Sequence, residues 1–501
     1  MPRPSRTALA TFPPGPVWPP GRRRSLWLEQ ALAAEHYPEP HPDRDSRLPP
    51  TADVCVVGGG FTGLWTALAL NRRDPSLNVV VLEADICGGG ASGRNGGFVM
   101  SAWSKFASLR KICGEADALR YAMASESAIA SIGGFLHETG IDGEFRRAGW
   151  LWAATNPAQL GAWETAVEAI APTGAAPYEL LSRQEVKKRS GSEQHLGGVF
   201  ERTGATFHPA KVARGLAAVA RRRGITVLEG TPVRAVHGDT RPRVDTERGQ
   251  IRADTVLLAL NAWTAALPQA RRSLVVTSSD MVATDPISER LDELGWEPGL
   301  SISDSRRLVN YYQRASDGRL VFGKGGGTLA FNGRVGNGFH GDSSRAAEVR
   351  AQFHYTFPQL SDVPVTRSWR GPIDYSVSGL PFMFKVGGHP AVLAAAGFSG
   401  NGCGPSYVVA DALAAMALGQ LSEDLPEALR SVPPSRLPPE PVRYLGGKLV
   451  RAAIARKEQA EDAARRPGRL TAALAGLDPT GFVDRGPEGA APELTEVARN
   501  G

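Results

Sequence analysis

Three glycines and one glutamate have the types and spacing that dinucleotide binding requires. The stretch DVCVVGGGFTGLWTALAL (53–70) contains Gly58, Gly60 and Gly63, and Glu83 follows twenty residues later. Glycine permits a tight turn at the first position, close approach of a pyrophosphate at the second, and close helix packing at the third. A carboxylate at Glu83 can accept hydrogen bonds from a ribose hydroxyl. The pattern therefore predicts a dinucleotide-binding site.

A strand, a turn, a helix and a second strand are needed to position these residues. The apolar run before the glycines is typical of a strand, and the residues after Gly63 follow helical periodicity. Phe61 and Thr62 open the expected helix, whose unpaired N–H groups can bind phosphates. The run NVVVLEA forms the next expected strand and ends at Glu83 and Ala84. An accidental glycine loop is the alternative, but it would not require these flanking elements.

Length and composition favour an ordinary globular protein of several domains. The 501 residues are too many for one core, and 42% are hydrophobic and 22% charged. We find neither eighteen uninterrupted apolar residues nor an apolar signal region, so we expect no membrane span and a cytoplasmic location. The four cysteines form no C-x-x-C pair, and we assign no metal. Despite the net charge of +6, the arginines are scattered, so we expect no nucleic-acid partner.

The order of the predicted elements indicates an α/β protein whose nucleotide domain is discontinuous in sequence. Strand, glycine-turn and helix patterns recur near the C-terminus in PAVLAAAGFSGNGCGPSYVVADALAAMALG, whereas the interval before it is rich in strands. We expect an N-terminal arm at 1–47, a Rossmann-like nucleotide-binding domain from 48–110, 200–270 and 365–424, an α+β substrate domain on a largely antiparallel sheet from 111–199 and 271–364, and a C-terminal helical extension and tail at 425–501.

Four segments together resemble the FAD-dependent amine and amino-acid oxidoreductases of the D-amino-acid oxidase, glycine oxidase and sarcosine oxidase type. They are VVGGGFTGLWTALAL with VVLEA, GGGASGRNGGF, GATFHPAKVARGLAAVARRRGITVLEGTPV and GFSGNGCGPSYVVADALAAM. The similarity is greatest to the bacterial γ-glutamylputrescine-oxidase-like branch. It implies FAD rather than NAD, and a small amine or amino acid as substrate, with O2 as the expected electron acceptor.

The resemblance also implies which further residues contact FAD. The glycine-rich loop would pass beside the flavin ring, the backbone of Val233 would meet the adenine, and the C-terminal glycine motif would meet the pyrimidine end of the flavin. The residues implied in addition to the first turn and Glu83 are Ala91, Ser92, Arg94, Asn95, Gly96, Gly97, Val233, Gly400, Asn401 and Gly402. Some relatives bind FAD covalently through cysteine or histidine. Because RNGGF has no histidine, SWRGPIDYSVSGLPFM has no cysteine, and Cys403 lies outside the usual position, we expect noncovalent FAD.

Candidates for substrate contact come from NYYQR and SWRGPIDYS in the second domain. Alternation along a strand would let Tyr312 and Arg314 share one pocket while Tyr311 points away, although the sequence does not settle which tyrosine faces the flavin. Arg314 or Arg370 could bind a substrate carboxylate through two parallel hydrogen bonds, or could form a salt bridge within the sheet.

Three further polar residues have more ordinary interpretations. Lys324 is a loose positional match to the oxygen-activating lysine of several relatives, but we favour an exposed loop lysine. His208 precedes an expected helix and is interpreted as a structural histidine. Asp374 could pair with a cationic amine, but we favour a role in turning a loop.

Three functions remain open from the sequence. The first is an oxidase that reduces O2 to H2O2, the second is a dehydrogenase that passes electrons to a quinone or carrier, and the third is a noncatalytic FAD-binding subunit. Neither the substrate nor the oligomeric state follows from the sequence.

Overall fold

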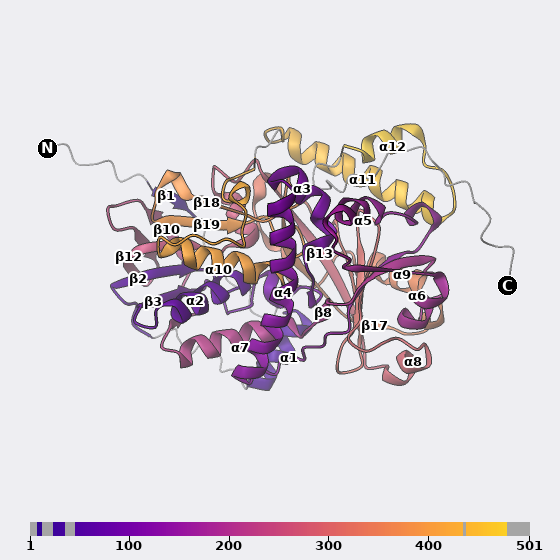
Figure 1. Cartoon of the computed structure of the whole chain (residues 1–501), viewed down its shortest axis with the longest axis horizontal. Coiled ribbons are helices and arrows are strands. Elements are labelled where there is room, and N and C mark those ends of the chain that lie inside the picture. Colours follow the sequence, from indigo (N-terminus) through magenta and orange to yellow (C-terminus); the bar gives the residue numbers. More distant parts are fainter. Residues whose placement is uncertain (1–7, 13–23, 36–45, 434–436, 478–501) are drawn as a thin grey trace.

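Two large β-sheets lie side by side in the computed structural model, with helices packed around them (Figure 1). The structure describes residues 8–12, 24–35, 46–433 and 437–477. None of the helices in these ranges is long and apolar enough to cross a membrane. The expectations for the rest of the N-terminal arm and for the tail after residue 477 lie outside the described residues.

The first sheet contains nine strands among the described residues, and its centre is parallel. Strands β12, β2, β3 and β9 are adjacent and parallel, and β19 pairs in parallel with β12. The outer strands β1, β10, β11 and β18 pair antiparallel. The strands are β1 (Ala8–Thr11), β2 (Thr51–Val57), β3 (Val79–Leu82), β9 (Thr226–Leu228), β10 (Val233–His237), β11 (Arg243–Thr246), β12 (Gly249–Leu258), β18 (Phe382–Lys385) and β19 (Val392–Ala396).

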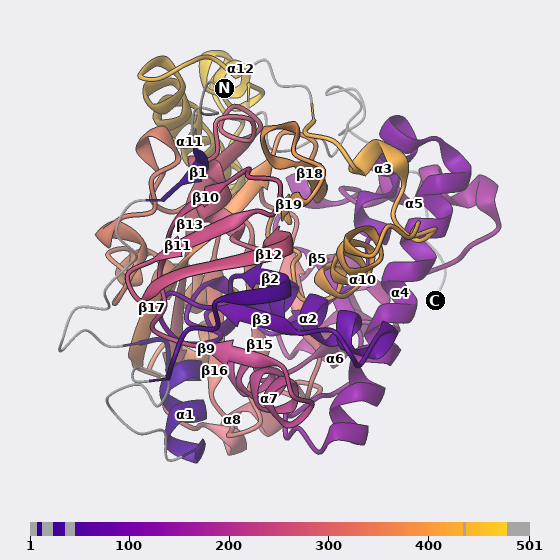
Figure 2. The same ribbon diagram turned by 90° about the vertical axis from the view of Figure 1, so that its left-hand side faces the viewer.

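Apolar helices bury one face of this sheet. Helices α2, α4, α7 and α10 share one apolar core with the strand residues Val54, Val56 and Val79, and Figure 2 shows α2, α4 and α10 on the same side of the sheet. Burial of the apolar side chains on both faces of β2 and β3 is the main force that holds the unit together. The four helices are α2 (Phe61–Arg73), α4 (Glu115–Thr139), α7 (Pro209–Arg222) and α10 (Pro405–Ala417).

The second sheet has eight strands in the described part of the chain and is antiparallel except between β14 and β5. One face packs on an aromatic core that includes Trp296, Phe353 and Phe357. The strand order is β17 (Val365–Ser376), β13 (Leu274–Thr284), β16 (Leu320–Lys324), β15 (Asn310–Arg314), β14 (Ser301–Asp304), β5 (Trp150–Ala154), β7 (Gly197–Glu201) and β6 (Tyr178–Leu181).

Shorter elements connect the sheets and cover their ends. The pair β4 (Phe98–Val99) and β8 (Ala205–Thr206) forms a separate two-stranded ribbon. The remaining helices are α1 (Leu26–Glu35), α3 (Phe106–Cys113), α5 (Glu164–Ile170), α6 (Arg183–Ser190), α8 (Ser288–Glu293), α9 (Ala346–Thr356), α11 (Val442–Asp462) and α12 (Arg469–Ala475). Helices α11 and α12, yellow in Figure 1, lie together along the top of that view.

The structure places two segments differently from the expected division. Strand β17 pairs along its length with β13, so residues 365–376 belong to the second sheet and not to the nucleotide unit. Helix α4 packs in the core of the first sheet, although residues 111–199 were expected in the substrate domain. Both differences arise because apolar periodicity shows that a segment is buried but not which core buries it.

Candidate functional site

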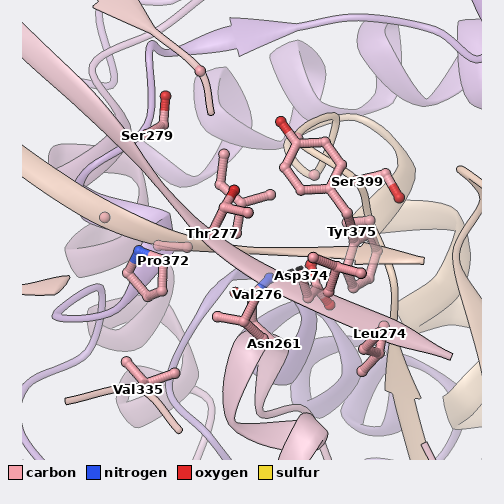
Figure 3. Close-up of a pocket in the computed structure, with 18 of the residues that line it drawn as sticks. Asn261, Leu274, Val276, Thr277, Ser279, Val335, Pro372, Asp374, Tyr375 and Ser399 are labelled. Atoms are coloured by element: carbon pink, nitrogen blue, oxygen red, sulfur yellow. Dashed lines mark hydrogen bonds between the residues drawn. The ribbon is translucent and has the colours of Figure 1, made fainter. Parts of the chain in front are cut away.

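A cavity of about 1160 Å³ runs between the two sheets and is the centre of the site. Figure 3 shows part of its wall, where Val276, Thr277 and Ser279 of β13 lie near Pro372 and Tyr375 of β17. Pockets for drug-sized ligands measure roughly 300–1,000 Å³. This cavity therefore has room for a dinucleotide together with a small second molecule.

The glycine turn lies at the junction between β2 and α2 and borders the cavity. Gly58 has φ +115°, and a side chain there would meet the carbonyl oxygen of Ala259 at 2.4 Å. Gly63 lies outside the cavity lining and instead permits close packing, since an added Cβ would lie 1.9 Å from the Gly58 oxygen. Phe61 and Thr62 begin α2 and line the cavity, so the N-terminus of this helix faces the cavity and favours an anion there.

Glu83 lies just beyond the end of β3 and joins the turn to its neighbouring loop. Its carboxylate accepts hydrogen bonds from the N–H groups of Gly59 at 2.7 Å and Asp85 at 2.9 Å. Burial raises the pKa of Glu83 to about 7, against the opposing effect of these two donors. The cavity wall also includes Ala84 and Val233, so the acid and the expected adenine contact lie in the same wall.

The glycine-rich loop 88–98 is held by internal hydrogen bonds and by the first helix. The side chain of Asn95 donates to the Ser92 carbonyl at 2.9 Å and accepts from the Gly97 N–H at 2.7 Å. In α1, Trp27 donates to the Asn95 carbonyl at 3.0 Å. A side chain at Gly97 would meet the Phe207 oxygen at 2.3 Å, so this glycine allows close packing and does not line the cavity.

Arg94 lies within this loop, and its side chain is anchored to main-chain carbonyls. It donates to the carbonyls of Phe339 at 3.1 Å and Gly89 at 2.5 Å. Burial lowers the pKa of Arg94 to about 10, which still leaves it charged at neutral pH. Ser92, in the same loop, accepts the Phe61 N–H at 2.9 Å and so links the loop to the start of α2.

The second glycine motif precedes α10 and faces the cavity through Gly400, Asn401 and Gly402. Asp374 holds this motif, because its carboxylate accepts from the Gly397 N–H at 2.5 Å and from Asn261 at 2.9 Å. Burial raises the pKa of Asp374 to about 7. Asp374 was expected in a loop, but it lies within β17 and fixes the turn from there.

The predicted cofactor-binding residues come together in one cavity wall. All except Gly63 and Gly97 line it, namely Gly58, Gly60, Phe61, Thr62, Glu83, Ala84, Ala91, Ser92, Arg94, Asn95, Gly96, Val233, Gly400, Asn401 and Gly402. In addition, the Oδ1 atom of Asn401 is buried and accepts no hydrogen bond within the described ranges. A dinucleotide with phosphates, a ribose and a hydrogen-bonding ring therefore fits this set of donors and acceptors.

The structure reverses the prediction for the two tyrosines of β15. Tyr312 lies in the aromatic core, stacked on Phe322 with ring centroids 4.9 Å apart and in contact with His195 through its hydroxyl. Tyr311 lines the cavity, and its hydroxyl lies 2.7 Å from the Ser279 Oγ. The alternation along the strand is as expected, but the face that meets the cavity is the opposite one. Gly323, the cross-strand partner of Tyr311, leaves room for the Tyr311 ring, because a side chain at this position would clash with the ring.

Neither predicted arginine faces the cavity. Arg314 forms an ion pair with Asp292 at 2.5 Å. Arg370 donates to the carbonyls of Gly338 at 2.8 Å and Asp342 at 2.9 Å. These contacts correct the prediction that Arg314 or Arg370 meets a substrate carboxylate, because both guanidinium groups are already satisfied by other parts of the second domain.

Other side chains line the cavity where Arg314 and Arg370 were expected, and the sequence did not predict most of them. Trp150 and Trp152 of β5 line the cavity with their rings stacked at 5.7 Å. Phe98 lies edge-on to Tyr311 at 5.9 Å. The alternating aromatics of GWLWAAT were a signal for two rings on one strand face. Lys105, in the turn before α3, also lines the cavity, and its ammonium forms no hydrogen bond or ion pair with the described residues.

Two remaining predictions have different outcomes. Lys324 is a buried residue of β16 and not an exposed loop lysine, and its ammonium donates to the Leu308 carbonyl at 3.1 Å. His208 caps α7 by accepting the Lys211 N–H at 3.2 Å, which agrees with a structural histidine. Burial lowers the pKa of His208 to about 4, so this side chain is neutral at pH 7.

The fold and the cavity define a dinucleotide-binding oxidoreductase with a second sheet over the nucleotide site. Residues 53–416 match the FAD dependent oxidoreductase family, also called DAO, and the chain belongs to this family. It is 31% identical over 383 residues to a probable oxidoreductase OrdL of Rhizobium meliloti, covering 74% of this chain and 84% of the relative. It is 28% identical over 382 residues to gamma-glutamylputrescine oxidoreductase of Escherichia coli, covering 74% and 84%.

Solved structures show the same fold. Glycine oxidase from Geobacillus kaustophilus superimposes with a TM-score of 0.63 at 21% identity, covering 77% of this chain and 99% of that one. L-proline dehydrogenase from P. horikoshii superimposes with a TM-score of 0.62 at 20% identity, covering 76% and 96%. Almost the whole of each neighbour is matched, whereas about a quarter of this chain has no counterpart in them.

Proposed function

We propose that this chain oxidises the C–N bond of a small amine or amino acid to an imine and passes the electrons to O2. The substrate loses two electrons and two protons, O2 gains them to form H2O2, and water hydrolyses the imine. FAD held by the glycine motifs supplies the two-electron acceptor for this chemistry. Family membership and the relatives named for amine and amino-acid oxidation support the proposal.

The observation that carries the proposal is the aromatic wall that adjoins the glycine motifs in the cavity. Phe98, Trp150, Trp152 and Tyr311 line the same cavity as Gly96 and Gly400. Aromatic faces attract a substrate ammonium and exclude water from the neutral amine that reacts. Burial raises the pKa of Tyr311 well above its usual range, so the phenol keeps its proton and orients groups rather than exchanging protons with them.

The test is anaerobic reduction of the bound flavin by a panel of amines and amino acids, followed by H2O2 measurement in air. We expect at least one compound to bleach the flavin and to yield about one H2O2 for each turnover. Bleaching without H2O2, but with turnover on an artificial quinone, would replace the oxidase by a dehydrogenase. A flavin that no compound of the panel reduces would contradict the substrate class.

We propose that the Lys105 ammonium binds an anionic group of the substrate. The sequence had suggested this role for Arg314 or Arg370. Burial, and then the charge of Arg307, lower the pKa of the Lys105 ammonium, and a bound carboxylate would raise this pKa again. A charge-assisted hydrogen bond contributes about 1.5–3 kcal/mol, or roughly 10- to 150-fold in affinity.

Two variants test Lys105 against a matched arginine. We expect Lys105→Met to lower kcat/KM for amino-acid substrates roughly 10- to 150-fold, and kcat/KM for the corresponding decarboxylated amines far less. The control Arg314→Met, which removes a cation outside the cavity, is expected to leave both kinds of substrate unaffected. Equal losses for acids and amines in Lys105→Met, measured as kcat/KM, would refute carboxylate recognition.

A further inference from the structure

Helix α11 forms one wall of the cavity although it lies outside the family match. The family match ends at residue 416, and α11 covers residues 442–462. Its cavity-lining residues include Tyr444, Gly447, Val450, Arg451 and Ile454. The helix is thus part of the boundary of the same space that the glycine motifs and the aromatic wall enclose.

Buried polar contacts hold α11 against the turn between β14 and β15. Glu458 accepts the Leu308 N–H at 2.9 Å, and its side chain is 7% exposed. Asp462 pairs with Arg306 and accepts the Asn156 amide at 2.8 Å. Contacts of this kind at the end of the helix fix its position relative to the second sheet, and a fixed wall can discriminate between ligands.

Apolar side chains of α11 and of neighbouring segments line one stretch of the cavity. Val450 and Ile454 pack with Leu308 in a small apolar cluster, and Leu308, Val309 and Leu329 line the cavity beside them. Arg451 and Arg306 at this wall are engaged by protein groups, because Arg451 donates to the Gly326 carbonyl and Arg306 pairs with Asp304 and Asp462. The apolar side chains between them favour an apolar group of the ligand.

We propose that α11 is a specificity-determining wall that receives an apolar chain of the substrate and limits its length. This inference rests on the proposed function, since it assigns a ligand class to that same site. Val450 is the residue we expect to set the limit, because it is half-buried, lines the cavity and lies midway along the helix.

The neighbouring residue provides a matched control on the same helix. Leu449 is 51% exposed, lies outside the cavity lining and differs from Val450 by one position. Phenylalanine at Val450 adds apolar volume to the cavity side, whereas phenylalanine at Leu449 adds it to the solvent side. Loss of burial for about two methylene groups of a ligand corresponds to roughly a tenfold loss of affinity.

The experiment uses the FAD-loaded protein and two probe series of increasing length. One is straight-chain amines from ethylamine to octylamine, and the other is straight-chain carboxylates of the same lengths, which cannot be oxidised at a C–N bond. Binding is followed by the change in flavin absorption, and turnover of the amines by kcat/KM. Melting temperature and flavin content establish that each variant is folded.

We expect Val450→Phe to lose about tenfold or more in affinity for the longest probes of both series, and Leu449→Phe to match the unchanged protein. Short probes should bind all three proteins equally. An unchanged length profile in Val450→Phe, or the same loss in Leu449→Phe, would overturn the proposal. If Val450→Phe fails to fold, Val450→Ala decides: a selective gain for the longest probes supports the wall, and an unchanged profile overturns it.

The two series also distinguish this inference from the proposed function. If no amine reduces the flavin but the carboxylates show the length-dependent loss, the wall is supported and the substrate class is wrong. If amines are oxidised with the same length profile in Val450→Phe and in the unchanged protein, the wall is wrong and the proposed function stands.

Discussion

The packing of α2 against the end of β2 leads to a quantitative prediction for Gly63→Ala. Gly63 lies in the first turn of α2, and an added Cβ would lie 1.9 Å from the Gly58 carbonyl oxygen and 3.3 Å from the Val56 Cγ1. Real Cβ atoms essentially never approach closer than 3.0 Å, so helix and turn must separate by more than 1 Å. The N–H groups that we expect to bind the phosphates would then lose their position relative to the Gly58 turn.

The expected cost follows from opposing effects of the added methyl group. Alanine favours a helix interior over glycine by about 1 kcal/mol, which acts against the damage. Forcing an extra carbon into close-packed structure costs about 1–3 kcal/mol, and here the obstacle is a backbone oxygen that cannot change rotamer. The net loss is up to about 2 kcal/mol, so we expect the apparent FAD affinity to fall by up to roughly 30-fold.

The assay is titration of the flavin-free protein with FAD, together with the flavin content of the protein as purified. Gly134→Ala is the matched control, because Gly134 lies within helix α4, is exposed and would bring its Cβ within 4 Å of no neighbouring atom. We expect this control to bind FAD normally and to gain slightly in melting temperature.

The decisive comparison is between the two alanine variants. Stoichiometric flavin and an unaltered dissociation constant in Gly63→Ala would refute the assignment of this turn to the pyrophosphate. A loss of circular dichroism equal to the loss of flavin would instead show that Gly63 supports folding as a whole.

Two further predictions concern the attachment of the cofactor and the response to pH. Acid precipitation should release all the flavin into the supernatant, because burial raises the pKa of the Cys403 thiol to about 12 and leaves it a poor nucleophile; yellow flavin that stays with the pellet would contradict noncovalent binding. Burial raises the pKa of Glu201 to about 7 from 4.5, so the folded protein keeps this proton after the unfolded chain has lost it. Stability should therefore fall as pH rises from about 5 to 8, by about 3 kcal/mol from this group, and Glu201→Gln should reduce the corresponding fall in melting temperature; an identical pH dependence in the variant would exclude Glu201 as its source.

Much of the nucleotide unit could be predicted from the sequence because its signals are local. The strand, glycine turn and helix around Gly58 and Gly63 form from consecutive residues, and Glu83 ends the next parallel strand. The predicted C-terminal helical extension contains α11, since helical periodicity depends on neighbours three and four positions apart. Such features need no knowledge of what packs against them.

The aromatic and cationic residues of the cavity depended on tertiary structure. Alternation along β15 was evident, but only the packing of Phe322 and Phe357 beside Tyr312 leaves Tyr311 on the cavity face. Arg314 and Arg370 had the right chemistry but find partners elsewhere in the second domain, whereas Lys105 enters the cavity from a turn far away in the chain.

The sequence by itself determined that this unit binds a dinucleotide, because consecutive residues encode the strand, the glycine turn and the helix. It did not determine which side chains meet the substrate, because a strand has two equivalent faces and the opposing sheet selects one of them. The contribution of α11 to the cavity was also decided by tertiary structure. Its contacts with Leu308 and Arg306 join residues about 150 positions apart, and no local pattern encodes such a pairing.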